Sequence, residues 1–288
     1  MLERAGAPFR GFGDWLARVV DGFYRVLGRP GKWLQDFVNG TWLGHPLHPV
    51  LTDVVIGGAT LIAVFDLSVL ILGAEGLETA SLMAVGFVAL SALGATASGL
   101  TDFKDTHTGN ERNVVVIHGL INIVASAAYV VSFLLRLGGS DDIGIWFSLG
   151  GVLVLTVGGY IGGHIVFKYG YTVNRNAFAK GQRAKEWTSV IAAADVPENT
   201  PTKVMLGSTA LVVVRRGDMV HALKATCSHA GGPLDQGELV GDTIVCPWHF
   251  SAFRLSDGAV RHGPATSRQV RYETRVNDLQ IEVQGPID

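Results

Sequence analysis

The sequence predicts a multi-domain membrane protein, in which an all-α bundle of four transmembrane helices precedes a C-terminal all-β domain. Three observations lead to this fold class. Of the 288 residues, 48% are hydrophobic and only 17% are charged, with a mean hydropathy of +0.32, whereas soluble domains carry roughly 25% charged residues. Long apolar runs are confined to the first part of the chain, and short β-type runs follow them. The length suggests about two domains.

Four apolar windows are long enough to span a membrane: Val50–Gly73, Thr79–Leu100, Val114–Leu135 and Ile143–Phe167. Each holds about 20 residues or more, which crosses a hydrocarbon core of roughly 30 Å. A buried helix of a soluble protein would explain one such run. Four in succession, joined by short connections, favour a transmembrane bundle over residues 41–171. No internal repeat is evident.

Residues 1–40 differ from the spans because they are rich in charge. Within them, Arg10–Leu27 is amphipathic, and its apolar residues recur at helical spacing: Trp15, Val19, Phe23 and Val26. The pattern predicts a helix lying on the membrane surface. The segment is too charged for the core of a signal peptide, so we expect no cleavage.

Basic residues are distributed unevenly between the two faces of the predicted bundle. Thirteen lie before the first span, in the second loop or after the fourth span: Arg4, Arg10, Arg18, Arg25, Arg29, Lys32, Lys104, Arg112, Lys168, Arg175, Lys180, Arg183 and Lys185. The opposite loops carry Arg136 with the acidic residues Glu75, Glu78, Asp141 and Asp142. The positive-inside rule predicts that both termini are cytoplasmic, in a multi-pass protein of the cell (inner) membrane.

The composition changes after the fourth span. Residues 172–185 read as a polar, basic linker, and residues 186–288 alternate short apolar runs with turn signals such as Asp257–Gly258 and Asn277–Asp278. Strands of four to six residues at this spacing predict a small all-β domain. The expected strands are Lys203–Leu206, Ala210–Arg215, Met219–Leu223, Asp242–Cys246, Ala252–Leu255, Arg271–Arg275 and Gln280–Val283.

Composition and motifs exclude several function classes. The net charge of −2 argues against a nucleic-acid-binding protein. Two cysteines are too few for a disulfide-rich scaffold or for an iron–sulfur centre held by four cysteines of this chain. No Walker or dinucleotide-binding fingerprint appears, because the glycines lie within spans or strand turns.

Both cysteines belong to a metal-ligand pattern. Cys227-Ser-His229 is followed, after sixteen residues, by Cys246-Pro-Trp-His249. A disulfide is one alternative, which a reducing cytoplasmic location disfavours. A zinc site is another, although paired zinc ligands normally have two to four residues between them and Cys227 and His229 have only one. The close spacing of Cys227 and His229 suits a binuclear cluster better, with the cysteines on one iron and the histidines on the other.

From about Glu186 to Val283 the sequence resembles a Rieske [2Fe–2S] domain. Residues around the ligand pairs fit the family as well: Gly231, Leu234, Ser251, Phe253, Asp257–Gly258 and Gly263–Pro264–Ala265. The resemblance implies that Gly231 lets its loop pass close to the cluster. It also implies that Pro264 belongs to a third loop that covers the cluster.

Departures from the family pattern indicate the ferredoxin type, which feeds oxygenases and nitrite reductases. The quinol-oxidising type carries an extra cysteine in each cluster loop, and this chain has none. That type also has a tyrosine that donates a hydrogen bond to a ligand sulfur, where this chain has Phe253, although Ser251 can still donate. Fewer hydrogen bonds predict a low potential within the Rieske range. Phe250 replaces a residue that is more often glycine.

The membrane part carries four histidines near the expected cytoplasmic boundary: His45, His48, His118 and His164. Ionisable residues in spans usually mark function. Two overlapping GxxxG patterns precede His164, and they indicate either close helix packing or room for a flat cofactor. We expect His118 and His164 as axial ligands of a b-type haem, with His45 and His48 as weaker candidates. A structural polar network including Asp53 is the alternative. Asp66, in the outer half of the first span, shows no partner on its own helix.

From about Trp42 to Tyr171 the sequence resembles an uncharacterised four-span membrane family, DUF2231-like, which has the HPLHP entrance and a later H-x-x-x-N. The resemblance implies no activity. Together the two parts predict a membrane-anchored one-electron transfer protein, an electron-transfer component of an oxidoreductase rather than a self-contained enzyme. We expect a redox partner protein or respiratory complex. The alternatives are a quinol-linked oxidoreductase subunit and a cluster-based redox sensor.

Overall fold

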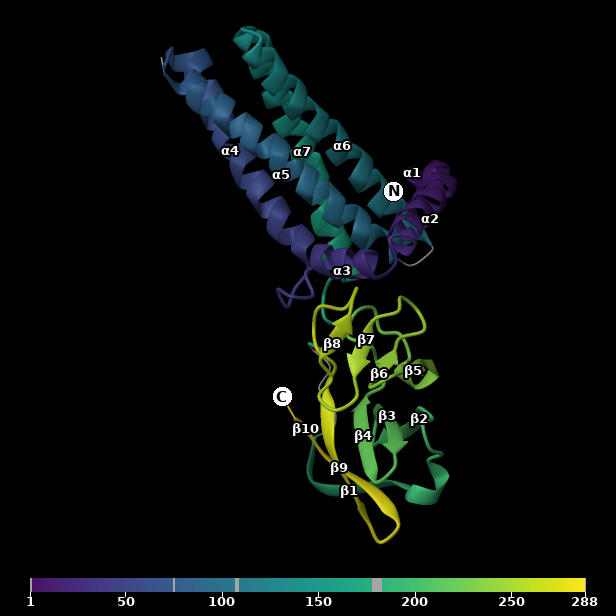
Figure 1. Ribbon diagram of the computed structural model, residues 1–288. Coiled ribbons are helices and arrows are strands. Elements are labelled where there is room, and N and C mark those ends of the chain that lie inside the picture. Colours follow the sequence, from purple (N-terminus) through teal and green to yellow (C-terminus); the bar gives the residue numbers. More distant parts are fainter. Residues whose placement is uncertain (1, 75, 107–108, 178–182, 288) are drawn as a thin grey trace. The chain divides into compact units, whose positions relative to one another are not determined.

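A computed structural model describes residues 2–74, 76–106, 109–177 and 183–287 (Figure 1). Glu75 and Lys180, which entered the orientation argument, and part of the expected linker lie outside these residues. The chain divides into two compact units. One comprises residues 1–34 and 46–171, and the other comprises residues 35–45 and 172–288.

The first unit contains the predicted bundle of four long helices. They are α4 (Leu47–Leu72), α5 (Leu77–Lys104), α6 (Asn110–Leu137) and α7 (Asp141–Tyr169). All four are long and apolar enough to cross a membrane, with mean hydropathies between 1.7 and 2.3. The predicted spans are therefore confirmed as helices, although each helix extends beyond its apolar window.

Glycines end two of these helices sharply. Gly73 follows α4 with φ +60°, and Gly170 follows α7 with φ +64°. Both donate their N–H groups back to carbonyls of the last helical turn. A left-handed residue that satisfies these carbonyls is a common helix stop, and glycine adopts the conformation without steric cost.

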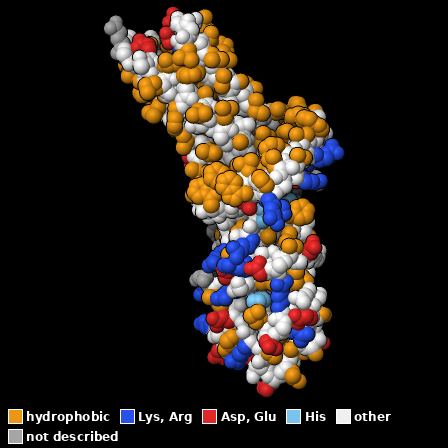
Figure 2. Space-filling view, in the orientation of Figure 1, with side chains coloured by type: hydrophobic (Ala, Val, Ile, Leu, Met, Phe, Trp, Pro, Cys, Tyr) orange, Lys and Arg blue, Asp and Glu red, His pale blue; other side chains and the backbone are white. Residues whose placement is uncertain are grey.

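The bundle buries a small core and leaves large apolar side chains outside. Ile62, Val85, Val88 and Tyr129 have no exposed surface, whereas Leu72, Leu90 and Leu153 are 70–75% exposed. Figure 2 shows hydrophobic side chains spread over the helices. An apolar exterior of this extent is expected of a surface that contacts lipid rather than water.

Before the bundle lie α1 (Leu2–Ala5), a short η1 turn (Ala7–Phe9), α2 (Arg10–Val26) and α3 (Gly28–Asn39). Helix α2 matches the predicted amphipathic segment. Its Ala17 packs with Phe103 and Val116. Trp15 and Phe23 are about half exposed and Val26 is 88% exposed, and the location of this stripe on the membrane surface stays a prediction.

The second unit is the predicted all-β domain, built from two antiparallel sheets (Figure 1). The larger sheet has the order β1-β10-β9-β4-β3-β2 and the smaller has the order β5-β6-β7-β8. Their bounds are β1 Ala184–Ala192, β2 Thr202–Leu206, β3 Thr209–Arg216, β4 Met219–Lys224, β5 Glu238–Val240, β6 Thr243–Val245, β7 Ala252–Arg254, β8 Val260–His262, β9 Arg271–Asn277 and β10 Gln280–Ile287.

Three strands were not predicted. Strands β5 and β8 have three residues each, mostly polar or exposed, and are too short to show an alternating pattern. Strand β1 begins at Ala184, within the expected linker, and pairs with β10 at the edge of the sheet. Its pairing depends on residues about 90 positions away in sequence, so the local pattern alone did not reveal it.

Candidate metal centre

Two loops of the β domain carry the predicted ligands. The first follows β4 and contains Cys227 and His229, and the second joins β6 to β7 and contains Cys246 and His249. The two loops repeat one hydrogen-bond pattern. Each cysteine donates its N–H to the carbonyl five residues later, Gly232 or Ser251, at 2.8 and 2.9 Å. The carbonyl of each cysteine also accepts the N–H of the residue four positions later, Gly231 or Phe250, at 3.0 and 3.1 Å.

The fourth residue of each loop adopts a left-handed conformation. Gly231 has φ +86° and Phe250 has φ +62°. The equivalence explains why glycine is commoner at the position of Phe250, since only glycine enters this region at no cost. Gly231 is therefore needed for the left-handed conformation of the turn. The close approach occurs at Gly232, where a Cβ would lie 2.6 Å from the Cys246 sulfur.

The structure brings the four predicted ligands together as a pair of sulfurs and a pair of imidazoles. Cys227 and Cys246 are 1% and 2% exposed, and their sulfurs are hydrogen-bonded. The His229 and His249 ring centroids lie 5.1 Å apart at 90°, and both side chains are half-buried. This is the division expected when the cysteines hold one iron and the histidines hold the other.

The hydrogen bond between the sulfurs raises the pKa of Cys227 and lowers the pKa of Cys246 to about 7. Backbone N–H groups lower the pKa of both cysteines. Those of His229 and Ala230 donate to Cys227, and those of Trp248 and His249 donate to Cys246. Donors aimed at both sulfurs stabilise thiolate, which is the form that binds metal.

Among the described residues, no three His, Cys, Asp or Glu side chains converge as ligands of a single ion. The residues present instead fit a binuclear group that takes two protein ligands on each metal. Two observations support that fit. Gly232 leaves open a space beside the Cys246 sulfur that a side chain would fill, and backbone N–H groups donate to both sulfurs.

A third loop, at residues 263–265, is tied to the second. The Ala265 N–H donates to the Ser251 hydroxyl at 3.0 Å, and both residues are buried. On its other side, Asp36 accepts the Gly263 N–H at 2.7 Å and bonds the His262 ring at 2.8 Å.

Gln269 and Asp36 support the loops, and sequence reasoning identified neither. Gln269 is 1% exposed, accepts the Ser228 N–H at 3.1 Å and donates to the Thr226 carbonyl at 2.6 Å. It thereby braces the Cys227 loop. A buried glutamine late in a strand-rich sequence carries no local signal, and Asp36 lies 226 residues from its partner His262.

In the helical unit, His118 lies beside His48, with ring centroids 6.4 Å apart. The His164 ring lies 5.7 Å from Tyr169. The space beside two of the glycines before His164 is filled by side chains, because a Cβ on Gly158 would meet Asn122 and one on Gly162 would meet His118. His45 is exposed and belongs to the other unit.

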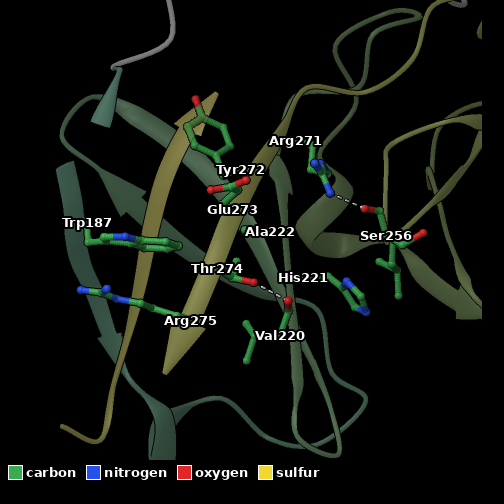
Figure 3. A pocket seen from close by; sticks show the side chains of 11 residues that line it. Trp187, Val220, His221, Ala222, Ser256, Arg271, Tyr272, Glu273, Thr274 and Arg275 are labelled. Carbon is green, nitrogen blue, oxygen red and sulfur yellow. Dashed lines mark hydrogen bonds between the residues drawn. The ribbon is translucent and has the colours of Figure 1, made fainter. Parts of the chain in front are cut away.

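The β domain also has an open cavity of about 450 Å³ between strands (Figure 3). Arg275 lies over the Trp187 ring at 4.4 Å, and Arg271 donates to the Ser256 carbonyl at 3.0 Å. None of the four predicted metal ligands lines this cavity. It is therefore separate from the metal centre.

Comparison with known families assigns both parts of the chain. Residues 186–278 match the Rieske [2Fe-2S] domain, and residues 44–175 match the family described as "Predicted membrane protein (DUF2231)". Ferredoxin CarAc from Metapseudomonas resinovorans is 35% identical over 100 residues, which are 34% of this chain and 94% of that protein.

Other relatives cover different shares. The cytochrome b6-f complex iron-sulfur subunit of Chlorobaculum tepidum is 28% identical over 49% of this chain and 77% of its own. An oxygenase component of 3-ketosteroid-9-alpha-monooxygenase from Rhodococcus rhodochrous is 39% identical over 26% of this chain, but only 19% of that protein is matched. The solved ferredoxin of carbazole 1,9a-dioxygenase from Nocardioides aromaticivorans IC177 is 29% identical over 34% of this chain and 96% of its own, with a TM-score of 0.33.

Proposed function

The chain belongs to the Rieske [2Fe-2S] protein family and carries a DUF2231 membrane domain ahead of its Rieske domain, and from this premise we propose that it is a membrane-anchored one-electron transfer protein. A domain that holds a cluster does no substrate chemistry of its own. The chain would thus be an electron-transfer component of an oxidoreductase rather than a self-contained enzyme.

The two cluster loops carry this proposal. Cys227 and Cys246 would hold one iron, and His229 and His249 would hold the other. The bound cluster would accept and release single electrons. Because the sulfurs are buried and both imidazoles are half-buried at the loop tips, the histidine edges offer the shortest route to a partner.

The exposed side chains beside the ligands support docking of a redox protein. Trp248 is 46% exposed and Phe250 is 64% exposed, on either side of His249. Exposed aromatic residues are enriched in protein interfaces. A ferredoxin and oxygenase components are among the chain's relatives, and we propose a partner that is an oxygenase or a respiratory complex.

We assign the domain to the ferredoxin type on the residues near the sulfurs. Phe253 is fully buried and has no hydroxyl to donate, and the Ser251 hydroxyl accepts the Ala265 N–H. The described cysteines are both ligand candidates, and neither is in a disulfide. The missing hydroxyl at Phe253 removes one donor to the cluster, which favours a lower potential.

Orientation and a second cofactor complete the proposal. Both termini and the Rieske domain would face the cytoplasm of a cell with this chain in its inner membrane, as the basic loops indicate. A b-type haem held by His118 and His164 stays a prediction, and it competes with the pairing of His118 with His48 that is argued in the next subsection. A Soret band that disappears in His118→Ala and His164→Ala would support it, and a haem-free, folded preparation would contradict it.

Spectroscopy on the purified full chain tests the main proposal. We expect two irons and two acid-labile sulfides per chain, with the low-temperature EPR signal of a reduced Rieske centre. Cys227→Ala and His249→Ala should remove that signal, whereas His221→Ala, in the same domain but away from the loops, should keep it. Stoichiometric zinc without the EPR signal would contradict the proposal.

Electron donors then separate the alternatives. Reduction by a ferredoxin reductase followed by oxidation by a partner protein supports the carrier role. Reduction that depends on added quinol supports a quinol-linked oxidoreductase subunit. Cluster-dependent association with a partner, without sustained electron flow, supports a redox sensor.

A further inference from the structure

The membrane unit contains a pair of histidines from two different spans. His48 lies near the start of α4 and His118 lies in the first turns of α6. Their rings are 6.4 Å apart between centroids and nearly perpendicular, at 86°. Both side chains are half-buried. Two imidazoles in contact inside an apolar bundle are costly to desolvate and call for a role.

Both rings are held in the same protonation state by a neighbouring helix. The Nδ1 atom of His48 lies 2.9 Å from the Ala95 carbonyl of α5, and that of His118 lies 2.9 Å from the Gly158 carbonyl of α7. A carbonyl only accepts, so Nδ1 carries the proton in each neutral ring and Nε2 carries the lone pair. This arrangement, with one ring nitrogen donating to a backbone carbonyl, is that of metal-binding histidines.

A glycine makes room for each ring. A Cβ on Gly99 would lie 2.8 Å from Cε1 of His48, and a Cβ on Gly162 would lie 2.9 Å from Cε1 of His118. Each glycine stands four residues after the carbonyl that its histidine uses. The hairpins α4–α5 and α6–α7 thus build the same site element twice.

The equivalence of the two hairpins extends further. Asp66 and Arg136 each lie eighteen residues after the histidine of their helix, and they pair with each other at 2.7 Å. Residues at matching positions of the two hairpins therefore meet twice in the bundle, once as the histidine pair and once as the ion pair.

We propose that His48 and His118 jointly bind one transition-metal centre through their Nε2 atoms. Asn122 Nδ2 lies 3.2 and 3.4 Å from Nδ1 and Nε2 of His118, so a metal at this Nε2 would replace an amide contact. Edge-to-face packing of the two rings is the structural alternative, and the metal analysis below distinguishes it from a metal site. Imidazoles sharing one metal at about 2 Å bond lengths have ring centres roughly 6 Å apart, close to the separation observed. Two nitrogen ligands suit the iron of a haem, which supplies its other ligands, or a two-coordinate copper(I) ion.

Metal analysis of the purified full chain tests this site. We expect about one metal per chain beyond the two irons of the cluster. Extra iron with a Soret band identifies haem, and copper without that band identifies a free ion. His48→Gln and His118→Gln should each lower this extra metal at least tenfold, while a glutamine amide can still donate to the helix carbonyl. His164→Gln should retain it, and this result separates a site at His48 and His118 from a haem held by His118 and His164.

The cluster EPR signal and the melting temperature are measured on every variant. They should match those of the wild type, because the site lies in the other unit and does not depend on the proposed electron-transfer function. If a variant fails to fold, wild-type protein is titrated with hemin and with copper(I). Saturable uptake of one equivalent of either supports the site. Lack of extra metal together with lack of uptake, retention in both glutamine variants, or loss in His164→Gln alone would overturn it.

Discussion

Asp66 and Arg136 form an ion pair between α4 and α6, with 2.7 Å between Oδ2 and Nη2 and at most 1% of either side chain exposed. Arg136 also donates to the hydroxyls of Ser81 and Ser148, at 2.9 and 2.8 Å. Sequence reasoning assigned Arg136 to a loop and found no partner for Asp66 on its own helix. The structure corrects the assignment of Arg136, because the arginine ends its helix within the bundle, and the partners of Asp66 come from other helices.

Breaking this pair should destabilise the bundle strongly. Asp66→Asn and Arg136→Gln are each expected to cost about 3–5 kcal/mol, since each leaves one buried charge without its partner. The double variant Asp66→Leu with Arg136→Met should lose less than the two single variants added together. Thermal unfolding in detergent measures the effect, with exposed Ser91→Ala as the control. Additive losses would show that the two residues are not coupled.

Phe253→Tyr should raise the potential of the cluster. The new hydroxyl can donate to the buried sulfur region, and a hydrogen bond of about 1 kcal/mol corresponds to roughly 40 mV for one electron, given about 59 mV per tenfold change. Phe250→Tyr makes the same change on an exposed ring and should leave the potential unchanged. A redox titration of both variants checks this, and equal shifts would contradict it.

Phe250→Gly should stabilise the second loop relative to Phe250→Ala. Both variants remove an exposed ring, but only glycine accepts φ +62° without strain, which costs other residues about 1–2 kcal/mol. After the loss of about 0.5–1 kcal/mol for the flexible unfolded glycine, we expect a net gain of about 0.5–1 kcal/mol. The temperature of cluster loss reports it as a few degrees. The reverse order would mean that the loop has a different conformation.

Asp36→Ala should loosen the third cluster loop. The variant removes two bonds to a charged carboxylate, those from His262 and Gly263. Such bonds are worth about 1.5–3 kcal/mol, and we expect the lower end because the Asp36 side chain is 24% exposed. Faster amide exchange at Gly263 and faster chelator-driven cluster loss measure the effect. Asp21→Ala, which breaks an exposed pair with Arg25, should change neither.

Single cysteines should reveal the orientation in the membrane. In intact cells, a membrane-impermeant thiol reagent is expected to label Asp142→Cys, in the first turn of α7, and to leave Thr200→Cys unlabelled until lysis. Both positions are exposed in the structure, and the native cysteines are buried. The opposite labelling would place the Rieske domain on the outer face.

The sequence by itself determined the features that depend on residue type and on short spacings along the chain. Apolar runs of span length specify transmembrane helices because backbone groups must be satisfied within each helix in lipid. The short spacing between Cys227 and His229, and between Cys246 and His249, specifies a ligand set because the residues of each loop are covalently close. The missing hydroxyl at Phe253 could also be read directly, since it is a property of one residue type.

Only the tertiary structure decided which distant residues meet. The Asp36 carboxylate accepts the Gly263 N–H, Asp66 pairs with Arg136, and the His118 ring lies beside the His48 ring. The sequence indicated only that the two histidines lie at a similar depth in the membrane. Each of these contacts joins elements that are far apart in the chain, and it exists only after helices or strands pack. The matching positions of His48 and His118, and of Asp66 and Arg136, likewise gain a meaning only from these contacts, because nothing in the residue types alone pairs them.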